Sequence, residues 1–252
     1  MSDVRRLMGR LYPPGMKYTV GFGGRPTIAP EDITGALGFI RDRFARETFC
    51  ALWWPEGASL TRREFDLELR DRQMREWTRR QRALVVARLA VDVAHDEVGA
   101  HGAVHGVRRA LAAARAELET ARSKAWPPWH RPLRIGDVPQ KQSRYAAIRA
   151  AVLAEIADPR SCKVCAGRGT LRADALIVKC DECGGTGQRA RSESGRAKAI
   201  GLTPQSYGRW AQVYEWTYTL VKTADETAAN VMKANMESDE AVKTSAIETD
   251  VS

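Results

Sequence analysis

Four of the five cysteines lie within residues 162–183, in the spacing C-x2-C-x14-C-x2-C. They are Cys162, Cys165, Cys180 and Cys183, and each pair opens the same pattern, C-x-x-C-x-G-x-G. A Cys-x-x-Cys turn directs two thiolates at one ion, so two such turns supply the four ligands of a tetrahedral zinc site. The glycines allow backbone amides to turn back toward the sulfurs. The spacing therefore predicts one zinc ion with a structural role, because four protein ligands leave no open position for a substrate.

A redox dithiol, or two unrelated cysteine pairs, is the competing interpretation of this stretch. The matching glycine tails of the two pairs favour a shared metal site instead. Between the pairs, the β-prone run Leu176-Ile177-Val178 predicts a short hairpin. The fifth cysteine, Cys50, lies in an apolar segment and is expected to be a buried free thiol. Tight cysteine pairs are typical of metal binding in a reducing compartment, not of a secreted disulfide framework.

The charge of the chain is unevenly distributed. Its 252 residues include 40 lysines and arginines against 31 carboxylates, for a net charge of +9. Seven carboxylates and two lysines fall in residues 225–252, so this end carries −5 and residues 1–224 carry +14. A positive body with an acidic end favours a polyanionic partner, most often nucleic acid; the competing interpretation is solubility charge on an arginine-rich protein. Residues 236–252 are predicted to be a disordered acidic tail.

The first half of the chain is predicted to be mostly helical. Residues 1–30 are rich in glycine, proline and arginine and are expected to form a flexible N-terminal arm. Residues 31–124 form a predicted helical N-terminal region, with one helix over 31–54 and a second from Ser59 toward His95. Arginines make the polar face of the second helix a candidate surface for phosphate or an acidic protein, although a solvated face is the commoner explanation. These arginines are Arg70, Arg72, Arg75, Arg79, Arg80, Arg82 and Arg88.

Two weaker signals precede the cysteines. His101 and His105 have the i, i+4 spacing of a helical metal site, but flanking glycines and the absence of a nearby carboxylate or cysteine argue against one. Residues 125–139 are predicted to be a proline-rich linker, because the segment cannot be helical throughout. Residues 140–235 then form the predicted zinc-hairpin and helix-turn-helix domain, which opens with a helix over 140–156.

A short helix, a turn and a longer helix are predicted after the second knuckle. Ser192 or Ser194 can cap the first helix, Gly201 supplies the turn, and Thr203–Pro204 is a typical helix start. This is the helix-turn-helix arrangement, with an αα-hairpin packed on the core as the competing interpretation. The second helix offers side chains that can contact base edges in the major groove, namely Gln205, Ser206 and Arg209. Basic side chains around the first helix are expected to lie near phosphates, namely Arg189, Arg191, Arg196 and Lys198.

Together these patterns predict a mainly α fold, a helical bundle with an inserted four-cysteine zinc β-hairpin and a helix-turn-helix. No apolar stretch is long enough to span a membrane and the N-terminus lacks an apolar signal core, so a cytoplasmic protein without a membrane partner is expected. The sequence contains no evident nucleophile–base pair, phosphate loop or open metal position. No enzymatic activity and no small-molecule substrate are therefore expected.

Two known families share parts of these motifs. The knuckles resemble the cysteine-rich region of DnaJ-type chaperones, but that family has four such repeats and a J-domain with a His-Pro-Asp tripeptide, where this chain has two repeats and no such tripeptide. Residues 140–233 more closely resemble the late-gene antitermination protein Q of lambda-like phages. Both have an alanine-rich helix before the cysteine hairpin, a basic step with serine, a short alanine-rich helix and one long helix. The residues that carry the resemblance are Leu202-Thr203-Pro204-Gln205, Trp210, Ala224-Asp225-Glu226, Ala228 and Asn230-Val231.

The resemblance implies a transcription antitermination factor. Members of that family bind a DNA element in a late promoter, engage RNA polymerase paused with its sigma factor, and travel with it through pauses and terminators. Double-stranded DNA and bacterial RNA polymerase are therefore the expected partners, in the cytoplasm or nucleoid of a bacterial host. Two alternatives stay open, a zinc-containing helix-turn-helix repressor without polymerase contact and a DnaJ-like zinc chaperone or adaptor.

Overall fold

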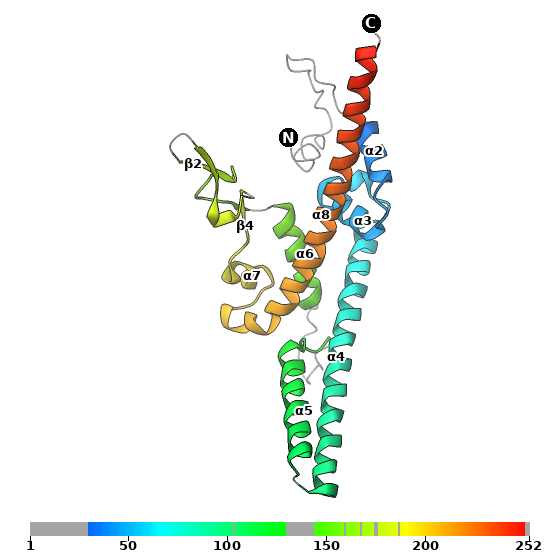
Figure 1. The fold of residues 1–252 in the computed structure, drawn as a ribbon. Coiled ribbons are helices and arrows are strands. Elements are labelled where there is room, and N and C mark those ends of the chain that lie inside the picture. Colours follow the sequence, from blue (N-terminus) through cyan, green and yellow to red (C-terminus); the bar gives the residue numbers. More distant parts are fainter. Residues whose placement is uncertain are drawn as a thin grey trace, which may run out of the picture. The chain divides into compact units, whose positions relative to one another are not determined.

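The computed structural model describes residues 30–102, 104–129, 144–158, 160–166, 168–173, 176–185 and 187–249. Helices dominate these residues, as predicted, and two short antiparallel strand pairs lie around the cysteines (Figure 1).

The chain divides into two compact units, each assembled from separated segments. The cysteine unit comprises the described parts of 1–66, 152–189 and 218–252, and the aromatic unit comprises those of 67–151 and 190–217. The predicted domains are continuous segments, whereas three of these unit boundaries fall inside helices α4, α6 and α8 and the fourth follows β4. Apart from Pro30, the predicted N-terminal arm lies outside the described residues.

The first predicted helix is two helices, α2 (Pro30–Gly38) and α3 (Arg43–Trp53). Asp42 begins the second, because its carboxylate accepts hydrogen bonds from the amides of Phe44 and Ala45, at 2.9 and 3.3 Å. The predicted apolar stripe is nevertheless buried on both sides of the break. Its buried members are Leu37, Ile40, Phe44 and Phe49.

A short 3-10 helix, η1 (Pro55–Gly57), leads into α4 (Arg62–His101). Thr61 and Glu64 form a capping box, since the Glu64 amide donates to Thr61 Oγ1 at 3.3 Å and the Thr61 amide donates to Glu64 Oε2 at 2.8 Å. The buried Glu47 carboxylate accepts from the amides of Ser59 and Leu60, both at 2.9 Å. Burial raises the pKa of Glu47, but hydrogen bonds from the Ser59 hydroxyl, the Arg46 guanidinium and the Leu60 amide outweigh it and leave the pKa below its usual value.

Within the aromatic unit, α4 and α5 (His105–Lys124) lie side by side and antiparallel (Figure 1). The last carbonyls of α5 have side-chain donors, because Arg80 donates to the carbonyl of Lys124 and Gln212 donates to that of Ser123, both at 2.6 Å. The remaining segments of the unit come from α6 (Arg144–Ala157), α7 (Glu193–Ala199) and α8 (Pro204–Thr249).

Aromatic rings fill the centre of this unit. Tyr145 stacks on Trp129 with ring centroids 4.3 Å apart and meets Trp210 edge-on at 5.3 Å. Its hydroxyl donates to the Pro127 carbonyl at 2.7 Å, and burial raises the pKa of Tyr145. Trp126 is 3% exposed and meets Trp216 at 5.3 Å. Residues of the predicted linker therefore form part of the core, and residues 130–143 lie outside the described ones.

A buried polar network accompanies the rings. Gln73 donates to Thr217 Oγ1 at 2.8 Å and accepts from the Arg149 guanidinium at 3.0 Å. All three side chains are buried, so these bonds replace the water that each would otherwise require.

The cysteine hairpin carries four short strands. Strand β1 (Arg160–Ser161) pairs with β4 (Gln188–Arg189), and β2 (Thr170–Ala173) pairs with β3 (Leu176–Lys179). The β2–β3 pair includes the predicted Leu-Ile-Val run. A 3-10 turn, η2 (Asp181–Cys183), then carries the second cysteine pair.

Helix α8 continues to Thr249, through most of the segment predicted to be an acidic tail. Glycine and proline are absent from residues 209–249, so nothing in this stretch terminates a helix that has already started. A net negative charge alone does not prevent helix propagation.

Candidate metal site and candidate DNA-contact surface

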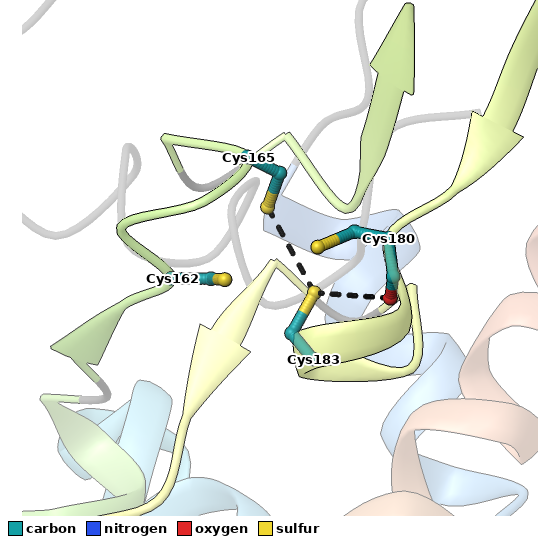
Figure 2. Close-up of side chains that lie close together, drawn as sticks. All are labelled: Cys162, Cys165, Cys180 and Cys183. Atoms are coloured by element: carbon teal, nitrogen blue, oxygen red, sulfur yellow. Dashed lines mark hydrogen bonds between the residues drawn. The ribbon is translucent and has the colours of Figure 1, made fainter. Parts of the chain in front are cut away.

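The sulfur atoms of Cys162, Cys165, Cys180 and Cys183 all lie within 4.8 Å of one another (Figure 2). They come from both ends of the β2–β3 hairpin, and each is a free thiol. The first three are fully buried, and Cys183 is partly buried. The structure thus brings together the four residues that the spacing predicts.

The separation of the sulfurs fits a metal ion better than a disulfide. A disulfide requires sulfurs about 2 Å apart. Tetrahedral ligands at a zinc–sulfur distance of about 2.3 Å stand about 3.8 Å from one another. The Sγ atoms of Cys165 and Cys183 are 3.8 Å apart. The cluster is therefore suited to a metal ion held by four thiolates.

Each knuckle directs one amide at its own second cysteine. Gly169 donates its N–H to Cys165 Sγ at 3.2 Å, and Gly187 donates its N–H to Cys183 Sγ at 3.3 Å. Both glycines occupy the last position of C-x-x-C-x-G-x-G. Amide donors of this kind stabilise negative charge on sulfur.

The same two glycines connect the knuckles to each other. The Cys180 amide donates to the carbonyl of Gly169 at 2.9 Å, and the Cys162 amide donates to the carbonyl of Gly187 at 2.8 Å. Each knuckle thus supports the first cysteine of the other, and the two halves of the site are related by approximate symmetry.

Left-handed backbone conformations explain the choice of glycine. Gly169 has a φ of 78°, and a Cβ there would lie 2.3 Å from the carbonyl oxygen of Gly185. Gly184 has a φ of 57° directly after Cys183. The equivalent residue of the first knuckle is Ala166, which adopts a φ of 50° despite its side chain.

The thiols differ in acidity. For Cys180, a hydrogen bond with Cys183 lowers the pKa, but burial and the three neighbouring thiols raise it to about 11. For Cys183, burial raises the pKa, but the amides of Gly187 and Gly185 and the neighbouring thiols lower it to about 7. The amides therefore favour one thiolate even before an ion neutralises the remaining charge.

The histidines do not join this site. His101 ends α4 and His105 begins α5, and both are exposed. Among the described residues, the four cysteines are the group of three or more ligand-type side chains close enough to share an ion.

The second candidate site is the turn between α7 and α8. Ser192 caps α7 by accepting from the Gly195 amide at 3.2 Å, as predicted. At the other end of α7, the Leu202 amide donates to the carbonyl of Ala197 at 2.9 Å, and the Gly201 amide donates to the carbonyl of Lys198 at 3.1 Å. These two bonds form the Schellman pattern. Gly201 has the left-handed φ of 67° that this pattern requires.

Side chains fix this turn within the aromatic unit. Arg144 of α6 donates to the carbonyls of Ile200 and Gly201, at 2.6 and 3.2 Å. Tyr207 and Tyr214 of α8 are buried, with ring centroids 6.1 Å apart. The first turns of α8 therefore have a packed face and an opposite, exposed face.

The three predicted base-contacting residues lie on the exposed face. Gln205, Ser206 and Arg209 are all exposed. Thr203 caps the start of α8, because its Oγ1 accepts a hydrogen bond from the Ser206 amide at 3.4 Å. The same oxygen donates to the Ser206 hydroxyl at 3.1 Å. Their exposure is compatible with contact to a partner, and none of them packs into the core.

The predicted phosphate-contacting residues divide into three kinds. Lys198 is exposed, and Arg189 is exposed but forms an ion pair with Glu182 at 3.1 Å. Arg191 is half-buried. Arg196 must be corrected, since it is 6% exposed, forms an ion pair with Glu215 and lies 4.9 Å over the Tyr214 ring. Its guanidinium links α7 to α8 and is not available to a phosphate.

The sequence interpretation missed the aromatic core around Trp126 and Trp129. The prolines between them indicate a local break and predict a linker, but they do not indicate what the two rings contact. Two tryptophans within four residues were a usable signal, because side chains of this size are seldom left in water.

Comparison with protein-family models, with curated proteins and with solved structures gave no match. Among the described helices, none combines the length and the apolar character needed to cross a membrane.

Proposed function

We propose that this protein is a zinc-stabilised, sequence-specific DNA-binding protein that acts as a late-gene transcription antitermination factor of the phage Q type. The observation that carries the proposal is the capped turn between α7 and α8, from which Gln205, Ser206 and Arg209 extend on the exposed face of α8. The four-cysteine cluster in the segment directly before α7 supports it, because compact DNA-binding proteins commonly use such a site for stability.

Zinc is the proposed ion because of the ligand set. Four thiolates in a tetrahedron suit zinc or an iron–sulfur centre, whereas oxygen ligands suit magnesium and calcium. An Sγ–Sγ distance of 3.8 Å corresponds to a single ion between the sulfurs. The ion would fix the hairpin, and it would have no open position for chemistry.

Base contact is assigned to α8 for chemical reasons. An arginine can form two hydrogen bonds to guanine, and a glutamine can form two to adenine, in the major groove. Arg209 and Gln205 therefore have the most informative side chains, with Ser206 as a less selective neighbour. Lys198 and Arg189 are left as phosphate contacts after Arg196 is excluded.

The charge of the protein agrees with this partner. A net charge of +9 favours association with a polyanion and makes the affinity fall as salt rises. Engagement of RNA polymerase rests on the resemblance of residues 140–233 to the Q family. It is the part of the proposal that needs a functional experiment.

Binding is tested by selection of sites from a random double-stranded DNA library with the purified chain. We expect a defined sequence, and we expect Arg209→Ala to relax the selection at one position at a cost of about 1–3 kcal/mol. Lys198→Ala should weaken all sequences by a similar factor, because a phosphate contact carries no sequence information. Arg108→Ala, at an exposed arginine of α5, is the matched control for loss of one charge.

Antitermination is tested by transcription with purified bacterial RNA polymerase. The template carries the selected site in a promoter, followed by a terminator, and the protein should raise read-through. Arg209→Ala and Cys162→Ser should abolish the effect, and read-through that persists in both contradicts the proposal. Site-specific binding without read-through supports a repressor instead. Suppression of client aggregation without DNA binding supports a chaperone or adaptor.

A further inference from the structure

The outward face of α4 carries an apolar stripe that α5 does not cover. Helices α4 and α5 lie side by side (Figure 1), so the buried residues of α4 along this stretch mark the seam between them. That seam contains the buried Ala87 and Ala94, and Leu118 is the buried residue of α5. Leu89 lies two residues from Ala87, which places it about 200° around the helix, on the side away from α5.

Four large apolar side chains lie on this outward face, and each is more than half exposed. Val85 is 56% exposed, Val86 65%, Leu89 57% and Val93 59%. One exposed valine needs no explanation, but four within nine helical residues form a continuous patch. We call these four residues the outer stripe.

Opposite charges stand at the two ends of the outer stripe. Arg82 lies seven residues before Leu89 and Asp96 lies seven residues after it, so both occupy the same face, about two turns from the centre. Both side chains are exposed, and neither has an ion-pair partner among the residues that the structure describes. The stripe is thus basic at one end and acidic at the other.

We propose that the outer stripe is a self-association surface, on which α4 of a second copy of this chain packs antiparallel about a two-fold axis at Leu89. In that arrangement a residue n positions before Leu89 faces the residue n positions after it in the partner. Val85 then faces Val93, Leu89 faces its own counterpart, and Arg82 faces Asp96. The Val85–Val93 and Arg82–Asp96 contacts each occur twice, and the Leu89–Leu89 contact lies on the axis.

The order of charges along the outer stripe favours α4 of a second copy as the binding partner. A nucleic acid would be attracted by Arg82 but repelled by Asp92 and Asp96, and the phosphates on its outer surface would not cover Leu89. A parallel second helix would place Arg82 beside Arg82 and Asp96 beside Asp96. An antiparallel copy pairs both charges and places Val85, Leu89 and Val93 against apolar side chains, with Val86 opposite Asp92. The two helical hairpins would then lie in a row, with the two α4 helices in the middle and an α5 on each outer side.

Charge reversal tests the pairing. The dimer dissociation constant of the nuclease-treated full-length protein is measured by analytical ultracentrifugation. Arg82→Asp and Asp96→Arg should each raise this constant by roughly tenfold, because each places like charges together twice. The double variant should return to within about threefold of the wild type, since it rebuilds the pairs with exchanged signs. Arg82 and Asp96 are fourteen residues apart in one helix, so rescue within one chain is not possible.

Two substitutions of Leu89, each with a matched control at Ala112, test the axis. Leu89→Glu should raise the dissociation constant by roughly a hundredfold, whereas Ala112→Glu, on the exposed face of α5, should leave it within about twofold. Leu89→Cys should form an intermolecular disulfide on mild oxidation, and Ala112→Cys should not. Circular dichroism confirms that each variant remains helical. A wild-type chain that is monomeric at about 0.1 mM, or a dimer unaffected by Leu89→Glu, overturns the proposal.

Discussion

The cysteine hairpin and the aromatic core differ in what keeps each of them folded. The buried hydrophobic residues of the hairpin are three cysteines, with Leu171 and Cys183 packed against them, while the neighbouring Leu176 and Ile177 are 71% and 75% exposed. In the aromatic core, by contrast, rings bury one another and the backbone between them.

This difference concerns the source of stability. A hairpin that leaves its largest apolar side chains in water gains little from the hydrophobic effect, so we expect it to depend on the proposed ion and on the backbone bonds of the knuckles. The aromatic core gains its stability from burial and needs no ion. We therefore expect each region to respond to a different perturbation.

The largest effect should follow loss of a metal ligand. Cys162→Ser should remove bound zinc, with a loss of about 10 kcal/mol of binding free energy, because the hairpin has no other source of comparable stability. Zinc content is measured by mass spectrometry, and helicity by circular dichroism. Most of the helical signal should remain, since the rings of the aromatic core do not depend on the ion.

The matched control is Cys50→Ala. Cys50 is fully buried, and burial, together with the charge of Glu47, raises its pKa to about 11, so it is an unreactive thiol away from the cluster. Zinc content should be unchanged in this variant. A loss of zinc in both variants would contradict the assignment of the four ligands.

The reverse experiment is Trp126→Ala. Removal of this ring, which is 3% exposed and has the Arg80 guanidinium 4.8 Å from its centroid, should cost about 3–5 kcal/mol of unfolding free energy. Zinc affinity should change little. Trp126→Phe is the control and should cost about 1 kcal/mol, since the indole Nε1 has no hydrogen-bond partner among the described residues. Equal unfolding curves for the Ala variant and the wild type would refute this account of the core.

A smaller effect is expected at the knuckle glycines. Gly169→Ala should weaken zinc binding by roughly a hundredfold, about 3 kcal/mol, because its φ is 78° and the new Cβ would meet the Gly185 carbonyl. Competition with a chelator measures the change. Gly208→Ala is the comparison in α8, where nothing lies within 4 Å of the added Cβ, and it should stabilise the helix by about 0.5–1 kcal/mol without altering zinc affinity.

The smallest effect should occur at Ala166. Ala166→Gly relieves a left-handed conformation and should tighten zinc binding by about 1 kcal/mol or less. Gly184→Ala, at the equivalent place in the second knuckle, should weaken it by a similar amount. If both changes had the same sign in the chelator competition, the equivalence of the two knuckles would have to be abandoned.

The parts of the fold that the sequence predicts correctly have local causes. Cysteine spacing fixes which sulfurs can share an ion, and the cluster contains those four residues. The turn after α7 was predicted from Ser192 and Gly201, whose roles involve residues no more than six positions away. Local geometry of this kind is encoded in consecutive residues.

The parts that were not predicted depend on contacts distant in sequence. Nothing in the sequence distinguishes Arg196 from the other basic residues around the short helix. Its ion-pair partner, Glu215, lies on the next helix. The carbonyl of Pro127 is satisfied by Trp77 and Tyr145, fifty and eighteen residues away. A proline pattern predicts where a helix ends, but it does not predict which residues the neighbouring tryptophans contact.

The amides and carbonyls of Gly169 and Gly187 have a consequence for the rate at which an ion exchanges. Each glycine bonds to a sulfur of its own knuckle and to the backbone of the other, so one knuckle cannot open without breaking bonds in both. Release of a bound ion should therefore be a single concerted event rather than a stepwise loss of ligands. We expect isotopic zinc to exchange slowly, and the amide protons of the two glycines to exchange with solvent at that same rate.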